Sequence, residues 1–323
     1  MSPDAPPQDE QPAPLLSIIT VFWNHREQLD GFFHGLEDAR RRLPFPIEVV
    51  AIDNASRDGT ADAIARDRPW VRLIRNDDNK LFAPACNQGL EAARGEYLLL
   101  LNPDCKARAS VLGAMVDFLR ANPRPGALGV ALVDADGQPQ LSAYPEPGWL
   151  TYWTSHSLVS GPFSRRKLRV AARLARGQRR TSRRVDWIIG ACLMVPRGVY
   201  QAVGALDPEY GMYSEDVDWC RRIRAAGRPV VQIPTMAMVH HQGSSSRRRP
   251  EFAFRRLYRS MLRYTLKHHG PIESRLLRAS VLLDMALRVP IHACQIDRAR
   301  LRSVLWVMRL MATGNEHLPD TSR

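Results

Sequence analysis

Cysteine and long apolar segments are both scarce in this chain, and each shortage excludes a class of protein. The five cysteines are widely spaced and form no CxxC pair, which argues against a disulfide framework or a zinc site and fits a reducing cytoplasm. No run of about 18 apolar residues is present, so the sequence predicts no transmembrane helix. Residues 1–14 are rich in proline and acids and lack the apolar centre of a signal peptide, so they are predicted to be a disordered tail.

Two further absences limit what the positive charge can mean. The net charge of +13 favours a polyanionic partner: nucleic acid, anionic lipid or a phosphorylated substrate. The chain has no helix-turn-helix, RNP or zinc-finger pattern, so nucleic acid is not expected as the partner. The first apolar strand is followed by FWNH, whose lack of glycine argues against the phosphate loop of a sugar-phosphate nucleotidyltransferase.

What is present is a regular alternation of strands and helices. Strands are predicted at residues 16–22, 47–52, 71–75 and 97–101, and helices at 25–42, 58–67, 82–93 and 108–121. Continuous apolar strands suit burial on both faces, so the pattern predicts βαβ units and a mostly parallel α/β sheet flanked by helices. After residue 126 the alternation fades. Further strands are expected at 185–196, 230–233 and 236–239, and a helix at 219–226.

Polar residues follow several of these strands. Asp53 and Asp104 each come just after a predicted strand, and Thr20 and Asn24 lie at the end of the first one. In open α/β sheets the ligand crevice lies at the carboxyl ends of the strands. Together these residues favour a binding site there, although either aspartate alone would also suit a helix cap or a turn.

Two segments are unusually basic. Residues 163–184 contain ten Lys/Arg and no acid, which is typical of an exposed excursion. Residues 252–311 predict helices with mixed apolar and arginine faces. Such helices can lie on an anionic bilayer, and packing on the rest of the chain or a dimer contact is the alternative.

Six segments in a fixed order carry a resemblance to a known family: IDNASRDGT, NKLFAPACNQG, LLLLNPDC, DWIIGACLMVPR, YSEDVDWCRR and MVHHQGSSS. Over residues 16–246 the chain resembles family 2 glycosyltransferases, most closely their bacterial rhamnosyltransferase-like branch. The resemblance implies a GT-A-type, Rossmann-like fold over residues 15–250. Its donor half would span about 15–104 and its acceptor half about 105–250, and a helical C-terminal extension would cover 251–323.

The function that this resemblance implies is an inverting, metal-dependent glycosyltransferase of cell-surface polysaccharide synthesis. Rhamnose is the leading sugar, taken from dTDP-rhamnose or another nucleotide sugar such as a UDP-sugar. The acceptor would be a hydroxyl of a glycan or lipid-linked glycan, on the inner face of the cytoplasmic membrane. A processive synthase is not expected, because the chain has neither membrane spans nor a QxxRW motif. The alternatives are an inactive family member or a basic module that binds polyanions.

The resemblance also implies roles for single residues. Asp216 would be the catalytic base, and Asp104 with His240 would hold Mg²⁺ or Mn²⁺, with His241 as the alternative ligand. The donor-binding residues would be Thr20, Phe22, Asn24, Asp53, Asn79, Asn87, Asn102 and Asp104. The acceptor-binding residues would be Trp187, Gly190, Ala191, Glu215 and Arg222.

Purely structural roles are alternatives for several of these residues. Glu215 and Asp216 would suit the first turn of a helix beginning near Val217. Arg222 could pair with Asp218, Trp187 could be core, and Asn87 could serve helix packing. Leu81 stands where members of this family commonly carry glycine, which permits a positive φ.

Overall fold

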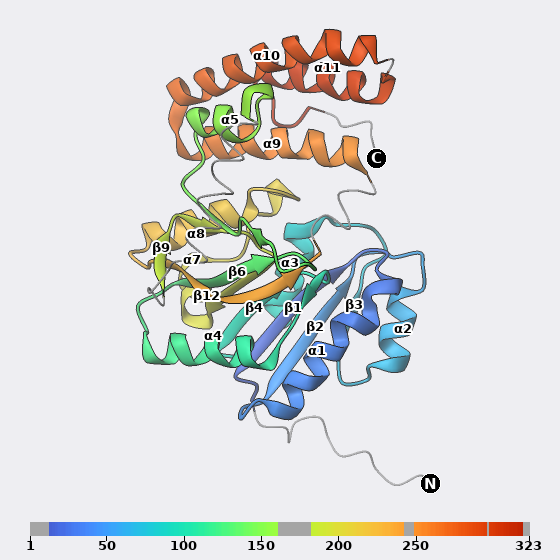
Figure 1. Cartoon of the computed structure of the whole chain (residues 1–323), viewed down its shortest axis with the longest axis vertical. Helices are drawn as coiled ribbons and strands as arrows, with labels where there is room; N and C mark the ends of the chain where they lie inside the picture. The colour runs from blue at the N-terminus through green and yellow to red at the C-terminus, as the bar shows by residue number, and fades with distance from the viewer. Residues whose placement is uncertain (1–12, 161–181, 242–248, 296, 319–323) are drawn as a thin grey trace.

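The computed structural model describes residues 13–160, 182–241, 249–295 and 297–318. A mixed β-sheet with helices on both faces forms one part, and a layer of helices lies beyond one end of it (Figure 1). The strands are β1 (Leu16–Phe22), β2 (Ile47–Asp53), β3 (Arg72–Arg75), β4 (Tyr97–Leu101), β5 (Cys105–Lys106), β6 (Ala127–Val133), β7 (Pro139–Gln140), β8 (Ala143–Tyr144), β9 (Arg183–Val185), β10 (Trp187–Ile188), β11 (Cys192–Pro196) and β12 (Val230–His240). The α-helices are α1 (Leu29–Arg42), α2 (Thr60–Asp67), α3 (Phe82–Ala92), α4 (Ala109–Ala121), α5 (Trp149–Ser155), α7 (Arg197–Val203), α8 (Glu215–Ala225), α9 (Pro250–His268), α10 (Gly270–Cys294) and α11 (Arg298–Thr313).

The main sheet has the strand order β3-β2-β1-β4-β11-β6-β12-β5. Strands β1 to β4 are parallel, as predicted, and β6 is parallel to β12. Strand β11 enters antiparallel between β4 and β6, so the sheet is mixed. The carboxyl ends of β1, β2 and β4 therefore meet along one edge, where the sequence places its polar residues.

Several elements differ from the sequence prediction, among them short ones that were not predicted: β5, β7, β8, α5 and α7. Strand β6, with the sequence ALGVALV, was not predicted, and the single run at 185–196 divides into β9, β10 and β11. The two strands predicted at 230–239 form one strand, β12, whose register shifts between Ile233 and Ala237. Pro234 lies in this irregular stretch and has no N–H to donate. Helix α8 begins at Glu215, four residues earlier than predicted.

Two apolar layers cover the faces of the sheet. Helices α1 and α4 pack on one face through residues such as Phe32, Phe33 and Met115, all buried. Helices α3 and α8 cover the other face, where Trp219 is fully buried. Because the strands are buried on both sides, their sequences are continuously apolar.

The C-terminal helices form a separate apolar core with α5. Tyr152, Tyr258, Val281 and Val307 belong to this core and are at most 2% exposed. Glu146 joins the core to the sheet domain, because its carboxylate bonds Arg221 of α8 as well as Tyr264 of α9. Among the described helices, none combines the length and the apolar character needed to cross a membrane.

Candidate active site

A cleft of about 420 Å³ lies where the sheet edge meets the C-terminal helices. Eight of the residues that the sequence predicted for the site line it: Asn102, Asp104, Trp187, Gly190, Ala191, Glu215, Asp216 and His240. A larger and more open hollow of about 860 Å³ elsewhere contains none of the predicted residues; five arginines line it, Arg124, Arg183, Arg184, Arg224 and Arg228. The chemistry is therefore sought in the smaller cleft.

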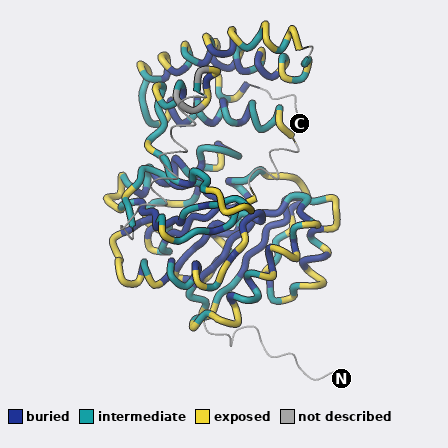
Figure 2. Tube along the Cα trace, in the orientation of Figure 1, coloured by how far each residue is buried: buried dark blue, intermediate teal, exposed yellow. Residues whose placement is uncertain are grey.

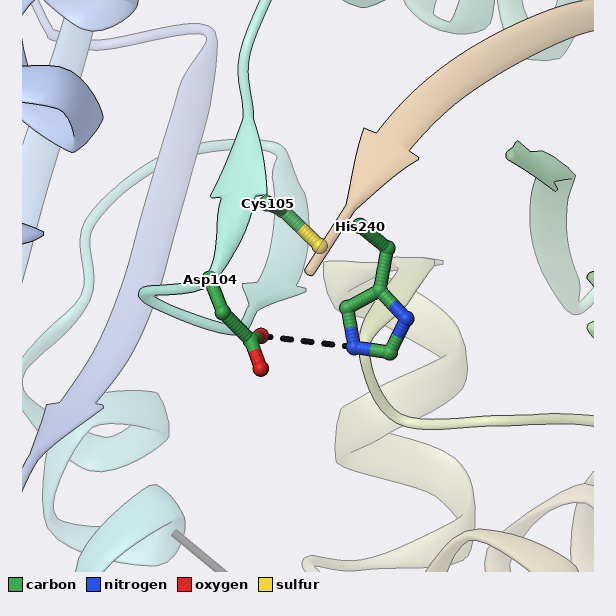
Figure 3. Close-up of side chains that lie close together, drawn as sticks. All are labelled: Asp104, Cys105 and His240. Atoms are coloured by element: carbon green, nitrogen blue, oxygen red, sulfur yellow. Dashed lines mark ion pairs between the residues drawn. The ribbon is translucent and has the colours of Figure 1, made fainter. Parts of the chain in front are cut away.

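Asp104 and His240 face each other on neighbouring strands of the sheet. Asp104 directly precedes β5, and His240 ends β12, which pairs with β5 (Figure 3). The His240 Nε2 and Asp104 Oδ1 atoms are 3.3 Å apart, and both side chains are less than a tenth exposed. His240 Nδ1 lies 2.9 Å from Gln140 Oε1. A ring that donates its Nδ1 proton to this oxygen turns the Nε2 lone pair toward Asp104.

Cys105 and His241 are neighbours of this pair in the sequence, but their contacts differ from those of Asp104 and His240. The Cys105 thiol lies within the same cluster but points to the Ala191 carbonyl oxygen at 3.3 Å, and burial raises its pKa well above the ordinary thiol range. His241 donates its backbone N–H to the Asp104 carbonyl, while the residue itself is exposed. Of the two adjacent histidines, His240 is the one whose ring meets Asp104.

Asp216 stands in the first turn of α8, facing the loop that precedes β11. Its Oδ2 accepts a hydrogen bond from Gly190 N at 2.8 Å, and its Oδ1 accepts one from Val217 N at 2.9 Å. Burial raises the pKa of Asp216 to about 6, against the lowering effect of these N–H donors. Tyr213 and Ser214 just before it both have positive φ, a strained backbone of the kind that often accompanies function.

Glu215 is the buried partner of this carboxylate. It is 5% exposed, and no described residue hydrogen-bonds its Oε2. Burial, and then the charge of Asp216, raise the pKa of Glu215 well above its usual range. Burial thus favours the neutral form of Glu215, while the N–H donors favour the ionised form of Asp216, the separation expected where one carboxylate acts as a base.

The opposite wall of the cleft is aromatic and apolar. Trp187 stacks on Tyr144 with ring centroids 4.6 Å apart, and its indole N–H donates to the Pro145 carbonyl. Trp187 is half-buried and lines the cleft, so it is not simply a core residue. Helix α9 adds Met261 and Tyr264 to the same wall.

Polar groups also gather at the carboxyl ends of β1 and β2, beside the cleft. Thr20 and Asp53 are buried, and the Thr20 Oγ1 and Asp53 Oδ1 atoms have no hydrogen-bond partner among the described residues. The other Asp53 oxygen accepts from Ser56 N. A buried oxygen without a hydrogen bond lowers the stability of the fold. These two oxygens therefore suit a site in which a bound ligand supplies the hydrogen-bond donors.

Besides Thr20 and Asp53, four predicted donor-binding residues do not line the cleft, and their contacts explain why. Phe22 is fully buried against Phe32 and Phe33. The amide of Asn87 bonds both the N–H and the carbonyl of Leu206, so it serves packing. The remaining two shape loops through their own side-chain oxygens: Asn24 accepts from Arg57 N, and Asn79 accepts from Leu81 N.

The position where relatives commonly carry glycine does require a glycine-like backbone. Leu81 has φ 68° and ψ −179°, a conformation nearly restricted to glycine. Asn79 Oδ1 accepts from the Leu81 N–H at 2.9 Å, and Asn54 donates to its carbonyl at 3.2 Å. These two bonds hold the strained backbone in place.

Arg222, predicted to bind the acceptor, does not line the cleft, and its contacts favour the alternative that it pairs with Asp218. Its guanidinium pairs with Asp218 at 2.8 Å and donates to the carbonyl oxygens of Val203 and Ala205. Asp218 is fully buried and is also bonded by Lys267 and His268 of α9. The arginine therefore belongs to a buried ionic network.

Replacement of this arginine should affect stability and leave acceptor binding unchanged. Arg222→Gln removes one of the three side chains that bond Asp218 and leaves two carbonyls unbonded, so we expect about 2–3 kcal/mol less free energy of unfolding, measured by urea titration. Arg298→Gln, at an exposed position on α11, is the control and should change it by less than about 0.5 kcal/mol. Unchanged stability with a raised acceptor KM would return Arg222 to the site.

Several cleft residues have no signal in the sequence. Thr151, Tyr152, Met261 and Tyr264 line the cleft, and all four reach it only through tertiary packing. Gln140 and Tyr144 do not line it but contact two residues that do, His240 and Trp187. Residues 161–181, most of the basic stretch, lie outside the described part of the chain, as do residues 1–12 and 242–248.

Comparison with known proteins shows the family to which the chain is related. Residues 17–169 match glycosyl transferase family 2. The chain is 32% identical over 248 residues to an N-acetylglucosaminyl-diphospho-decaprenol L-rhamnosyltransferase of Mycobacterium tuberculosis, an alignment that covers 73% of this chain and 79% of the relative.

Solved structures share the fold at low sequence identity. A mannosyltransferase from Pyrobaculum calidifontis, in complex with GDP-Man and Mn²⁺, superposes with a TM-score of 0.53 at 16% identity, over 95% of this chain and 88% of the other. GalNAc-T7 with UDP, GalNAc and Mn²⁺ gives a TM-score of 0.54 at 16% identity, over 80% of this chain and 48% of the other. The fold is thus of the GT-A type, with a helical C-terminal extension. The chain belongs to glycosyl transferase family 2, and it is a glycosyltransferase.

Proposed function

We propose that the protein transfers L-rhamnose from a nucleotide sugar to a hydroxyl of a lipid-linked glycan, with inversion of the anomeric configuration. The observation that carries the proposal is the placement of Asp216 and the Asp104–His240 pair along one cleft. The rhamnosyltransferase of M. tuberculosis supports the choice of sugar and acceptor class. dTDP-rhamnose is the leading donor, and a UDP-sugar is the alternative.

Asp216 would act as the base on the acceptor. An alcohol is a weak nucleophile near neutral pH, so a carboxylate must remove its proton as it attacks the anomeric carbon. The N–H groups of Gly190 and Val217 hold the Asp216 carboxylate in place in its ionised form. A single attack on the face opposite the leaving diphosphate inverts that carbon. Glu215, whose neutral form is favoured by burial, would hydrogen-bond the acceptor rather than take its proton.

The Asp104–His240 pair fits a divalent cation. Two ligands bound side by side at about 2.1 Å from one ion stand roughly 3 Å apart, close to the 3.3 Å found here. A carboxylate and an imidazole whose other nitrogen bonds Gln140 form a ligand set suited to Mn²⁺ or Mg²⁺. When bound, the cation would supply positive charge to the leaving diphosphate. The neutral Cys105 thiol is a poor ligand for such a hard ion.

The two halves of the sheet domain would divide the substrates. We place the nucleotide at the ends of β1 and β2, within residues 15–104, where Thr20 and Asp53 keep unsatisfied oxygens. The acceptor would enter within residues 105–250, between Trp187 and Asp216. The apolar wall from α9 and α10 suits an acceptor that carries a lipid, with the protein held at the inner face of the cytoplasmic membrane.

The donor can be tested by thermal unfolding with Mn²⁺ and a series of nucleotide sugars. A ligand that binds only the folded protein at about 100 times its Kd stabilises it by roughly 2.7 kcal/mol. We expect dTDP-rhamnose to give the largest shift and UDP-N-acetylglucosamine a smaller one. Transfer to a polyprenyl diphosphate-linked N-acetylglucosamine, followed by mass spectrometry, checks the acceptor. Transfer of another sugar in place of rhamnose would refute the assignment.

A further inference from the structure

Helix α10 presents an apolar face to solvent, the reverse of the usual arrangement in a surface helix. Five residues form what we call the α10 apolar face: Ile272, Leu276, Leu283, Leu287 and Ile291. Ile272 is 73% exposed and Leu283 is 56% exposed. The five positions are separated by four or seven residues, so they share one side of the helix.

Two polar groups of α10, Asp284 and Ser274, lie on its opposite, buried side. Asp284 is 1% exposed, and its carboxylate accepts hydrogen bonds from Tyr152 and pairs with Arg288. Ser274 is also buried. Figure 2 shows exposed positions recurring along the outer side of the C-terminal helices. The described residues leave the outer apolar face of α10 uncovered, and an exposed apolar patch of this kind marks an interaction surface.

The charges around this face are of one sign. Arg275 is exposed on α10, and α11, which packs against α10, exposes Arg298, Arg302 and Arg309. Within the described part of residues 270–313, no aspartate or glutamate is exposed. An apolar face beside arginines complements an anionic bilayer. A symmetric contact with a second copy would instead bring these arginines toward their own equivalents.

The same helix borders the cleft. Leu277 lines the cleft from its buried side, while the adjacent Leu276 belongs to the α10 apolar face. A helix of 25 residues is about 37 Å long, and α10 is not apolar enough to cross a membrane. It suits a position parallel to the bilayer surface.

We infer that the α10 apolar face is a membrane-docking surface, which lies in the interface of an anionic bilayer with the neighbouring arginines on lipid phosphates. Only the role of this docking rests on the proposed function, because docking would hold the cleft beside a lipid-linked acceptor. The occupant is the lipid surface and not a second copy of the chain.

The test is co-sedimentation of the full chain with vesicles of phosphatidylglycerol and phosphatidylcholine. The double variant Leu283→Gln, Leu287→Gln should lower the partition coefficient of the protein about tenfold or more. The reason is that two leucine side chains no longer move from water into the bilayer on binding. Leu266→Gln, which removes a comparably exposed leucine from α9, is the matched control and should change it little. Replacement of Arg298, Arg302 and Arg309 by Gln should weaken binding to these vesicles and flatten its salt dependence.

Two measurements separate docking from the enzyme's activity. Transfer to a short, water-soluble acceptor should be unchanged in both α10 and α11 variants, because neither set of residues lines the cleft. Absence of that transfer in the wild type would count against the proposed function and leave docking standing. Docking is overturned if the wild type binds anionic vesicles no better than phosphatidylcholine alone, or if the leucine variant binds as the wild type does. A dimer that the leucine variant dissociates, without vesicle binding, would assign the face to a second copy.

Discussion

Asp216→Asn should lower kcat by about 10²–10⁴ while the nucleotide sugar binds almost as well as before. Asparagine keeps the size of the side chain and accepts a hydrogen bond from Gly190 N, but it cannot take a proton from the acceptor. The donor is held at the other end of the site, so its affinity should hardly change. Turnover and donor affinity are to be measured on the same folded preparations.

The pH profile gives an independent readout of the same group. Burial raises the pKa of Asp216 to about 6, so the ionised, active form is lost as the pH falls through that value. At pH 5 roughly a tenth of the carboxylate is ionised, and the wild-type rate should fall accordingly. The residual rate of Asp216→Asn should lack this step.

The neighbouring glutamate supplies the control. Glu215→Gln puts a neutral amide in place of a carboxyl whose neutral form is favoured by burial, so we expect a higher acceptor KM and a smaller effect on kcat. If Asp216 served only as a helix cap, asparagine would replace it with little loss. Near-wild-type turnover in Asp216→Asn, or a product with retained anomeric configuration, would therefore disprove the base assignment.

The sequence predicted the donor half of the fold well because the signals there are local. Strands β1, β2 and β4 are continuous apolar runs, and Asp53 and Asp104 mark their carboxyl ends directly. Strand β6 was missed because three of the residues in ALGVALV are alanine or glycine, which carry weak strand preference. Its role becomes clear only when β11 and β12 pair on either side of it.

The candidate site was predicted in part, for a related physical reason. Asp216 and His240 stand in distinctive short motifs, so sequence alone could single them out. Phe22, Asn87 and Arg222 stand in equally distinctive segments, but tertiary contacts direct their side chains to the core, to Leu206 and to Asp218. Conversely, Gln140 and Tyr264 approach the cleft from elements distant in sequence, and nothing in their local pattern indicates it.

Removal of the divalent cation should reduce transfer to background, and addition of Mn²⁺ or Mg²⁺ should restore it. Asp104→Asn keeps the size of the side chain but removes its charge, and His240→Ala removes the nitrogen that lies 3.3 Å from it. Loss of a group that stabilises developing charge typically costs about 10²–10³ in rate, which we expect as the minimum for either variant.

Binding of the nucleotide should test Asp104 and His240 as metal ligands without any turnover. A cation and a diphosphate that bind together raise each other's affinity by an equal factor, so Mn²⁺ should tighten dTDP binding to the wild type. In Asp104→Asn and His240→Ala this effect of Mn²⁺ should disappear. Cys105→Ser is the matched control, because it lies in the same cluster and keeps a donor to the Ala191 carbonyl; Mn²⁺ should still tighten dTDP binding to it. Full turnover in excess chelator, or Mn²⁺-dependent dTDP binding that survives in both ligand variants, would remove Asp104 and His240 as metal ligands.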